Sequence, residues 1–163
     1  MKHFYLRADS IGHIYLAGSN DVLAANVISA IGTRMDGITL IGNEDWLQFP
    51  SLSLDQMERL GICLVGSQFI HYQSAEALDF REKYLKTHGE LPSKYAYLGY
   101  ETLWFAGQQL RQSGTLFQAE LMQKPFVNGK LSEGFCFYHS TTNTYVPLTK
   151  LEAGAPVLIN PQP

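Results

Sequence analysis

Short apolar runs in the first part of the chain predict three strands. The runs cover residues 12–18, 37–42 and 62–66, and each ends on a glycine. The second run, GITLIG, is almost continuously apolar, which is typical of a strand buried on both faces of a parallel sheet.

Two helices are expected between these strands. Behind the first run, apolar residues recur at helical spacing, and Ser19 or Asn20 can cap the helix that they form. Behind the second run, Ser53 and Gln56 have the spacing of a capping box that opens a short helix ending at Gly61. Alternating strands and helices predict an α/β fold with a Rossmann-like parallel sheet flanked by helices.

From Ser74 the pattern is helical for about 40 residues. One helix is expected from Ser74 to Gly89 and a longer one from Ser93 to Gly114. On the longer helix, residues at helical spacing share one apolar face: Ala96, Tyr100, Leu103, Gly107 and Leu110. Gly107 on this face would let a neighbouring element approach closely.

After Pro125 the pattern changes to short alternating segments and a Pro-rich end, which predict a small C-terminal antiparallel β addition. We therefore expect a single α/β region over residues 1–163. Its portions are a strand–helix–strand part (12–72), a helical part (73–124) and a β-rich tail (125–163).

Composition and charge exclude several classes of partner. Hydrophobic residues make up 45% of the 163 residues, and the net charge is −3 without any Lys/Arg-rich run, so no nucleic-acid interface is expected. No apolar stretch approaches the length of a bilayer span, so no membrane insertion is expected either. Arg7 and Asp9 interrupt the first apolar residues, and no signal peptide is predicted in this chain.

No motif for catalysis, a metal or a cofactor is present in the sequence. The chain has no G-x-S-x-G, no G-x-G-x-x-G, no P-loop and no C-x-x-C, and no two histidines are four residues apart. We expect a protein that is not an enzyme and has neither cofactor nor metal, with structural histidines at His3, His13, His71, His88 and His139. Cys63 and Cys136 are expected to be buried thiols, although one disulfide is also possible. A hydrolase would require one of these thiols exposed beside a histidine.

Polar residues follow the first two predicted strands, where ligands gather in open α/β sheets. Ser19 and Asn20 come directly after Gly18, and Glu44, Asp45 and Trp46 come shortly after Gly42. A carboxylate there could hold an ammonium group while the indole shields the contact from water, which would strengthen it. Alternatively, the carboxylates are solvated loop charges and Trp46 packs on the core.

The third strand is followed by aromatic residues, FIHY, which include Tyr72. They could form one wall of a pocket or fill the core.

Three segments together resemble the type I periplasmic binding proteins, most closely the branched-chain amino-acid receptors. They are HIYLAGSNDVLAANVISA, ITLIGNEDW and FREKYLKTHGELPSKYAYLGYETLWFAGQQLRQSG. The most recognisable feature is F-x-x-x-Y…G-x-x-P…Y-A-x-x-G-Y-[DE], which begins at Phe80 and ends at Glu101. The resemblance covers roughly residues 12–148.

This resemblance implies binding of a small amino-acid-like solute without catalysis, as in a transporter-linked receptor or sensor of the periplasm or cell envelope. An acidic residue after the strand equivalent to ITLIG holds the ammonium group in such receptors, which assigns that role to Glu44, with Asp45 second. Ser19 and Asn20 would hydrogen-bond the solute, and Trp46 and Tyr72 would form walls. The family often has an aromatic residue where this chain has Ser19, so stacking there is not expected.

Members of this family are about twice as long, and this chain corresponds to their C-terminal half. A complementing N-terminal half, or a second copy in a homodimer, could complete the fold. The alternative is a degenerate relative that serves as a cell-envelope scaffold without a ligand.

Overall fold

The computed structural model describes residues 11–34 and 37–160, which divide into two compact units. Unit 1 consists of the described residues up to Gly66 together with Pro147–Asn160, and unit 2 consists of Ser67–Val146. The expectations for His3, Arg7 and Asp9 lie outside the described residues. Among the described residues, no helix is both long and apolar enough to cross a membrane.

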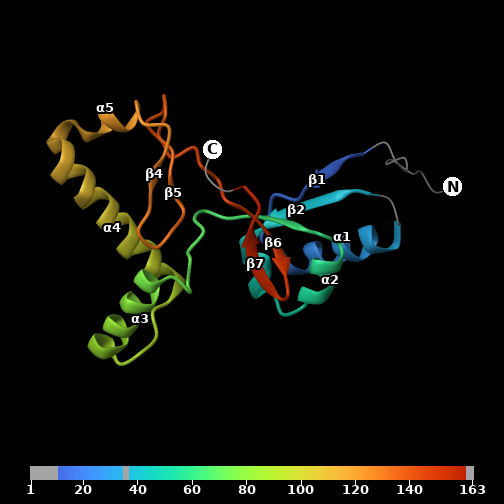
Figure 1. The fold of residues 1–163 in the computed structure, drawn as a ribbon. Helices are drawn as coiled ribbons and strands as arrows, with labels where there is room; N and C mark the ends of the chain where they lie inside the picture. Colours follow the sequence, from blue (N-terminus) through green and yellow to red (C-terminus); the bar gives the residue numbers. More distant parts are fainter. Residues whose placement is uncertain (1–10, 35–36, 161–163) are drawn as a thin grey trace. The chain divides into compact units, whose positions relative to one another are not determined.

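Unit 1 is built on a five-stranded mixed sheet with the order β1-β2-β3-β6-β7 (Figure 1). The first three strands are parallel, as predicted, whereas β6 is antiparallel to β3 and β7 is antiparallel to β6. The strands are β1 (His13–Tyr15), β2 (Thr39–Asn43), β3 (Cys63–Val65), β6 (Leu148–Glu152) and β7 (Ala155–Leu158).

The helices of unit 1 are α1 (Asp21–Arg34) and α2 (Leu54–Arg59), and a 3₁₀ turn, η1 (Glu44–Gln48), follows β2. Asn20 caps α1 by accepting a hydrogen bond from the backbone N–H of Leu23 at 2.8 Å. Ser53 caps α2 by accepting from the backbone N–H of Gln56, the bond expected from the capping-box spacing.

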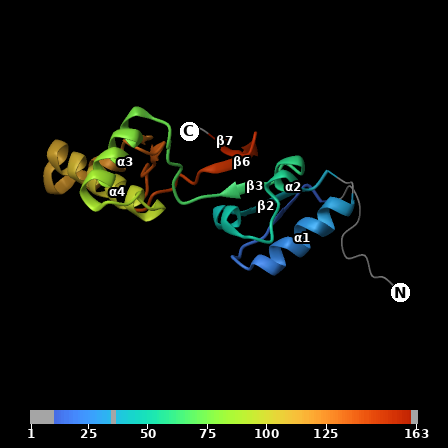
Figure 2. The same ribbon diagram turned by 90° about the horizontal axis from the view of Figure 1, so that it is seen from below.

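Both helices lie on the same side of the sheet (Figure 2). Their apolar residues and those of the strands form one core, comprising Ala24, Ile28, Ile31, Leu40, Trp46, Met57, Ile62, Leu64 and Leu151. In β2, Leu40 and Gly42 are buried, whereas the alternate residues are only half-buried. The expectation of burial on both faces is therefore wrong for this strand: one face packs on helices and the other is partly open.

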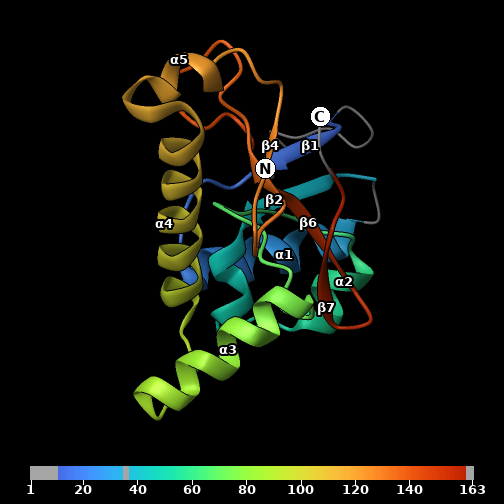
Figure 3. The same ribbon diagram turned by 60° about the vertical axis from the view of Figure 1, so that its left-hand side comes forward.

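Unit 2 is mainly helical, with α3 (Ala75–His88), α4 (Lys94–Ser113), the 3₁₀ turn η2 (Gly114–Leu116) and α5 (Phe117–Leu121). Ser74 and Ser93 cap the N-termini of α3 and α4. Gly89 ends α3 in the left-handed conformation, with φ of 76°, which glycine adopts without strain. A two-stranded antiparallel sheet, β4 (Val127–Asn128) and β5 (Gly134–Phe135), lies beside α4 (Figure 3).

Helix α4 buries a different face from the apolar face predicted above. The buried residues are Tyr97, Glu101, Phe105 and Gln109, at the spacing of a single stripe. Leu103 and Leu110, assigned to the apolar face, are 76% and 48% exposed. Periodicity alone could not show which of the two stripes is buried. The buried stripe contains Glu101, and this carboxylate is stable in the interior only because a distant loop donates hydrogen bonds to it.

The predicted C-terminal β addition exists, and it is divided between the two units. Strands β4 and β5 belong to unit 2, whereas β6 and β7 extend the main sheet of unit 1. The fold class, a largely parallel sheet with flanking helices and a small antiparallel sheet, is confirmed.

Candidate functional site

The loops that follow β1 and β2 meet at the carboxyl ends of these strands. The hydroxyl of Ser19 donates a hydrogen bond to Oδ2 of Asp45 at 3.2 Å. The indole Nε1 of Trp46 donates to the backbone carbonyl of Gly18, also at 3.2 Å. Two of the segments singled out in the sequence are thus held together by direct bonds, as expected where parallel strands end at one edge of a sheet.

Trp46 serves the core of unit 1. Its side chain is 0% exposed and lies over Gly42, where a Cβ atom would approach the indole ring to 2.5 Å. Only a glycine leaves room for the ring at this point, which explains why β2 carries a glycine just before its polar end. The structure therefore places Trp46 beneath the loops, where it fixes their spacing, and leaves no exposed indole surface to form a wall.

The other polar residues at this edge have structural partners as well. The side-chain oxygen of Asn20 caps α1, which leaves the amide N–H₂ of the same side chain for other contacts. The hydroxyl of Tyr15 donates to Oδ1 of Asn43 at 3.4 Å. Glu44 and Asp45 occupy the first turn of η1, with Glu44 half-buried and Asp45 exposed. We call the group Ser19, Asn20, Asn43, Glu44 and Asp45 the polar edge.

The charge of the polar edge is negative, because it contains two carboxylates and no basic side chain. Near it, Asp21 accepts a hydrogen bond from the hydroxyl of Ser51. This arrangement suits a ligand with a cationic group and several hydrogen-bonding atoms.

Tyr72 belongs to unit 2 rather than to the unit that contains the polar edge. Its ring packs edge-to-face on Tyr97 with the centroids 5.0 Å apart, and the side chain is partly exposed. Its contact with Tyr97 gives it a packing role within unit 2.

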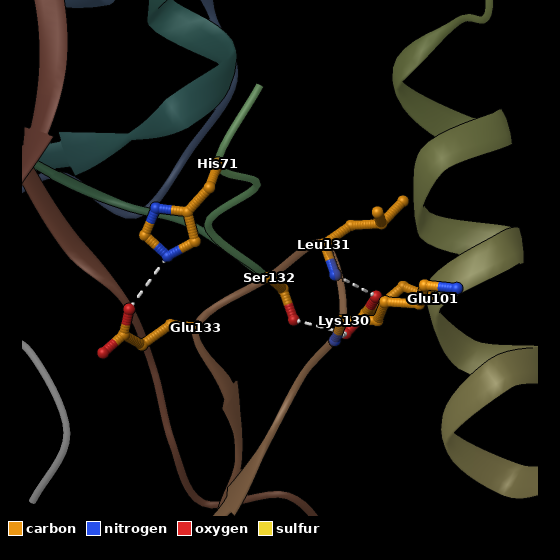
Figure 4. Close-up of polar contacts among 6 residues, drawn as sticks. All are labelled: His71, Glu101, Lys130, Leu131, Ser132 and Glu133. Carbon is orange, nitrogen blue, oxygen red and sulfur yellow. Dashed lines mark hydrogen bonds and ion pairs between the residues drawn. The ribbon is translucent and has the colours of Figure 1, made fainter. Parts of the chain in front are cut away.

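A second polar cluster lies in unit 2 and centres on the buried carboxylate of Glu101 (Figure 4). Oε1 accepts hydrogen bonds from the backbone N–H of Lys130 at 2.8 Å and from the hydroxyl of Ser132 at 2.9 Å. Oε2 accepts from the backbone N–H of Leu131 at 2.7 Å. Glu101 thereby ties the loop between β4 and β5 to the middle of α4.

No role was predicted for this cluster, although Glu101 ends the motif quoted above. A signal was present, since a carboxylate at the spacing of Tyr97 and Phe105 must be either exposed or fully bonded. Nearby, Nε2 of His71 lies 2.9 Å from Oε2 of Glu133, on the exposed side of the same loop. Figure 4 shows this pair pointing away from Glu101.

Cys63 and Cys136 do not form a disulfide. Both cysteines are free thiols, with Cys63 buried and the Cys136 thiol donating to the carbonyl of Pro125 at 3.2 Å. In the described part of the chain, no three His, Cys, Asp or Glu side chains are grouped so that they could hold a metal ion.

No family model matches this chain, and no curated protein matches it. Two solved structures of an ABC transporter substrate-binding protein from Desulfitobacterium hafniense are similar to it. One, described as a complex with Leu, has a TM-score of 0.50 and 18% sequence identity and covers 91% of this chain. The other has a TM-score of 0.53 and 19% identity over 90% of this chain.

The chain spans only 43% of the length of each of these structures. At this level of identity the comparison shows the fold, and it confirms the resemblance to periplasmic binding proteins on that level. The part of that fold to which the chain corresponds is less than half of it.

Proposed function

We propose that this chain binds a small amino-acid-like solute at the polar edge of unit 1, without catalysis, as an ABC-transporter substrate-binding protein or sensor. The observation that carries the proposal is that hydrogen bonds join the loops after β1 and β2, so that their polar side chains form one acidic group. The fold in which this group lies is similar to that of a substrate-binding protein. Acidic side chains at the carboxyl ends of parallel strands are well placed to receive a cationic ligand group.

In this proposal the carboxylate of Glu44 pairs with the α-ammonium group of the solute. Its partial burial lowers the local dielectric constant and strengthens the ion pair. Asp45 adds a second negative charge and is oriented by the hydroxyl of Ser19. The amide N–H₂ of Asn20 donates to an oxygen of the solute, while Trp46 holds the two loops in register from below.

The proposal includes a location in the periplasm or cell envelope. It also includes completion of the fold by an N-terminal half, in the same longer polypeptide or in a separate one, or by a second copy, since the chain spans less than half of the matched structures.

A second candidate function is a cell-envelope scaffold that has lost its ligand. The observation in favour of it is the exposed apolar surface of α4, where Tyr95 is 80% and Leu103 is 76% exposed. Exposed apolar residues that form a contiguous patch are typical of surfaces that contact another protein, and a scaffold would use α4 in this way. A scaffold of this kind would show no response to any amino acid.

The test is a thermal-shift panel with the natural amino acids, followed by calorimetry on those that respond. At about 100 times Kd, a one-site ligand stabilises the folded state by about 2.7 kcal/mol, a shift that is easily measured. Glu44→Gln keeps the shape of the side chain and removes its charge, so it should abolish the response. Glu90→Gln, a matched change at an exposed glutamate of unit 2, should leave it intact.

A response that survives Glu44→Gln would refute the assigned role of Glu44. No response to any amino acid would leave either a scaffold or a site that is formed only with the remainder of the fold, and it would favour the scaffold.

A further inference from the structure

Unit 2 contains a cavity of about 330 Å³ between the C-terminal half of α4 and the segment that joins α5 to β4. Figures 1 and 3 show these two segments side by side. Helix α4 contributes Trp104, Gln108 and Gln112, which follow one another at intervals of four residues, together with Gln109. The facing segment contributes Lys124, Phe126, Val127 and Asn128.

Gln109 is the most informative residue of this cavity. It is only 3% exposed and belongs to the buried stripe of α4, and its carboxamide has no hydrogen-bond partner among the described residues, although its polar atoms are not sealed from solvent. Its N–H₂ and carbonyl groups therefore face the open space of the cavity, where water or a bound group can hydrogen-bond to them. A ligand in the cavity could hydrogen-bond to these donors and to this acceptor in place of water.

The remaining lining residues define the chemistry of that group. Four carboxamides line the cavity, and those of Gln108, Gln109 and Gln112 each offer two N–H donors and one carbonyl acceptor. This set matches adjacent hydroxyl groups, which donate and accept at the same oxygen. Trp104 and Phe126 are half-buried, so their remaining surface is available to the C–H faces of a ring.

The charge near the cavity is positive. Lys124 lines it, and no carboxylate is among the lining residues. The Nζ of Lys130 lies 5.9 Å from the centroid of the Trp104 ring and donates to the hydroxyl of Tyr100. A ligand with a negative group is therefore favoured over a neutral one.

The cavity is also held in shape from one end. The three hydrogen bonds to Glu101 attach the loop after β4 to α4, about one helical turn before Trp104. A pre-formed cavity of this volume is in the ordinary range for small-molecule sites.

We propose that this cavity binds a sugar acid, that is, a pyranose ring that carries a carboxylate. Lys124 pairs with the carboxylate, Gln109 and Gln112 bond to ring hydroxyls, and Trp104 packs on the ring face. The site lies wholly within unit 2 and does not depend on solute binding at the polar edge of unit 1.

The test is titration of the ¹⁵N-labelled protein with D-glucuronate up to about 20 mM, which detects millimolar affinity. The chain has two tryptophans, Trp46 in unit 1 and Trp104 in unit 2, so their indole N–H signals report on the two units separately. We expect saturable shifts of the Trp104 indole and of glutamine carboxamide signals, with the Trp46 indole unchanged.

Two variants and one control decide the assignment. Lys124→Met should weaken binding by about tenfold or more, the effect of losing roughly one charge-assisted hydrogen bond. Gln112→Ala, at an exposed position that folding does not require, should weaken it as well, whereas Gln123→Ala outside the cavity should not.

Absence of any saturable shift would overturn the proposal. An equal response to D-glucose would overturn the assignment of an acidic ligand.

Discussion

Replacing the buried carboxylate of Glu101 by a carboxamide should destabilise unit 2 substantially. Glu101 is 0% exposed, and its two oxygens accept all three of its hydrogen bonds. In Glu101→Gln one oxygen becomes an N–H₂ group, which would face either the N–H of Leu131 or the two donors from Lys130 and Ser132.

The size of the effect follows from these contacts. At least one bonded donor loses its acceptor and is opposed by another donor, and the remaining bonds lose the contribution of the negative charge. A hydrogen bond to a charged group contributes about 1.5–3 kcal/mol, so we expect a loss of roughly 2–4 kcal/mol in the free energy of unfolding. That is a large fraction of the stability of a small domain, which is roughly 5–15 kcal/mol.

The assay is urea denaturation followed by circular dichroism, with Glu90→Gln as the control. Glu90 is an exposed glutamate of the same unit, and its replacement should change the unfolding free energy by less than about 0.5 kcal/mol. Combining Glu101→Gln with Ser132→Ala should cost less than the sum of the two single changes, because the bond from Ser132 has already lost its charged acceptor in Glu101→Gln. The reasoning would be refuted if Glu101→Gln were as mild as the control, or if the two changes were additive.

Two further predictions concern packing and charge. Gly42→Ala should lower the unfolding free energy by about 1–3 kcal/mol, because the added Cβ overlaps the Trp46 ring. Gly18→Ala, with nothing within 4 Å of the added atom, should lower it far less. Thermal unfolding of both variants checks this prediction, and equal effects would contradict it. The pKa of Lys83 lies above its ordinary value because its ammonium donates a hydrogen bond to Asp79 at 2.7 Å and lies beside the charge of that carboxylate. In an NMR pH titration, Asp79→Asn should therefore lower the pKa of Lys83 toward the ordinary value. The pair is exposed, so the same variant should show no measurable change in stability. An unchanged lysine pKa in this variant would show that Asp79 is not the cause.

The positions of the helices, the parallel strands and the polar loops could be predicted from the sequence. These features are local: Ser53, Ser74 and Ser93 each cap a helix by a bond to a residue three positions later, and Gly61 and Gly89 stop helices through conformations that favour glycine. The order of strands and helices was sufficient for the α/β class and for locating Ser19 and Glu44 at one edge of the sheet.

Contacts between residues far apart in the chain decided the rest. Trp46 is buried because Gly42 leaves a space beneath it, which periodicity does not reveal. Helix α4 buries the face with Glu101 because a loop about 30 residues further along supplies three donors to its carboxylate. The tail divides because β6 pairs with β3, some 85 residues earlier, while β4 and β5 pair only with each other.

A sequence pattern thus determined what each segment is, since helix caps, turns and strands depend on neighbouring residues. Which surface each segment buries, and which polar groups meet, depended on the balance between burying apolar area and satisfying every buried polar atom. That balance is settled only when distant segments pack together.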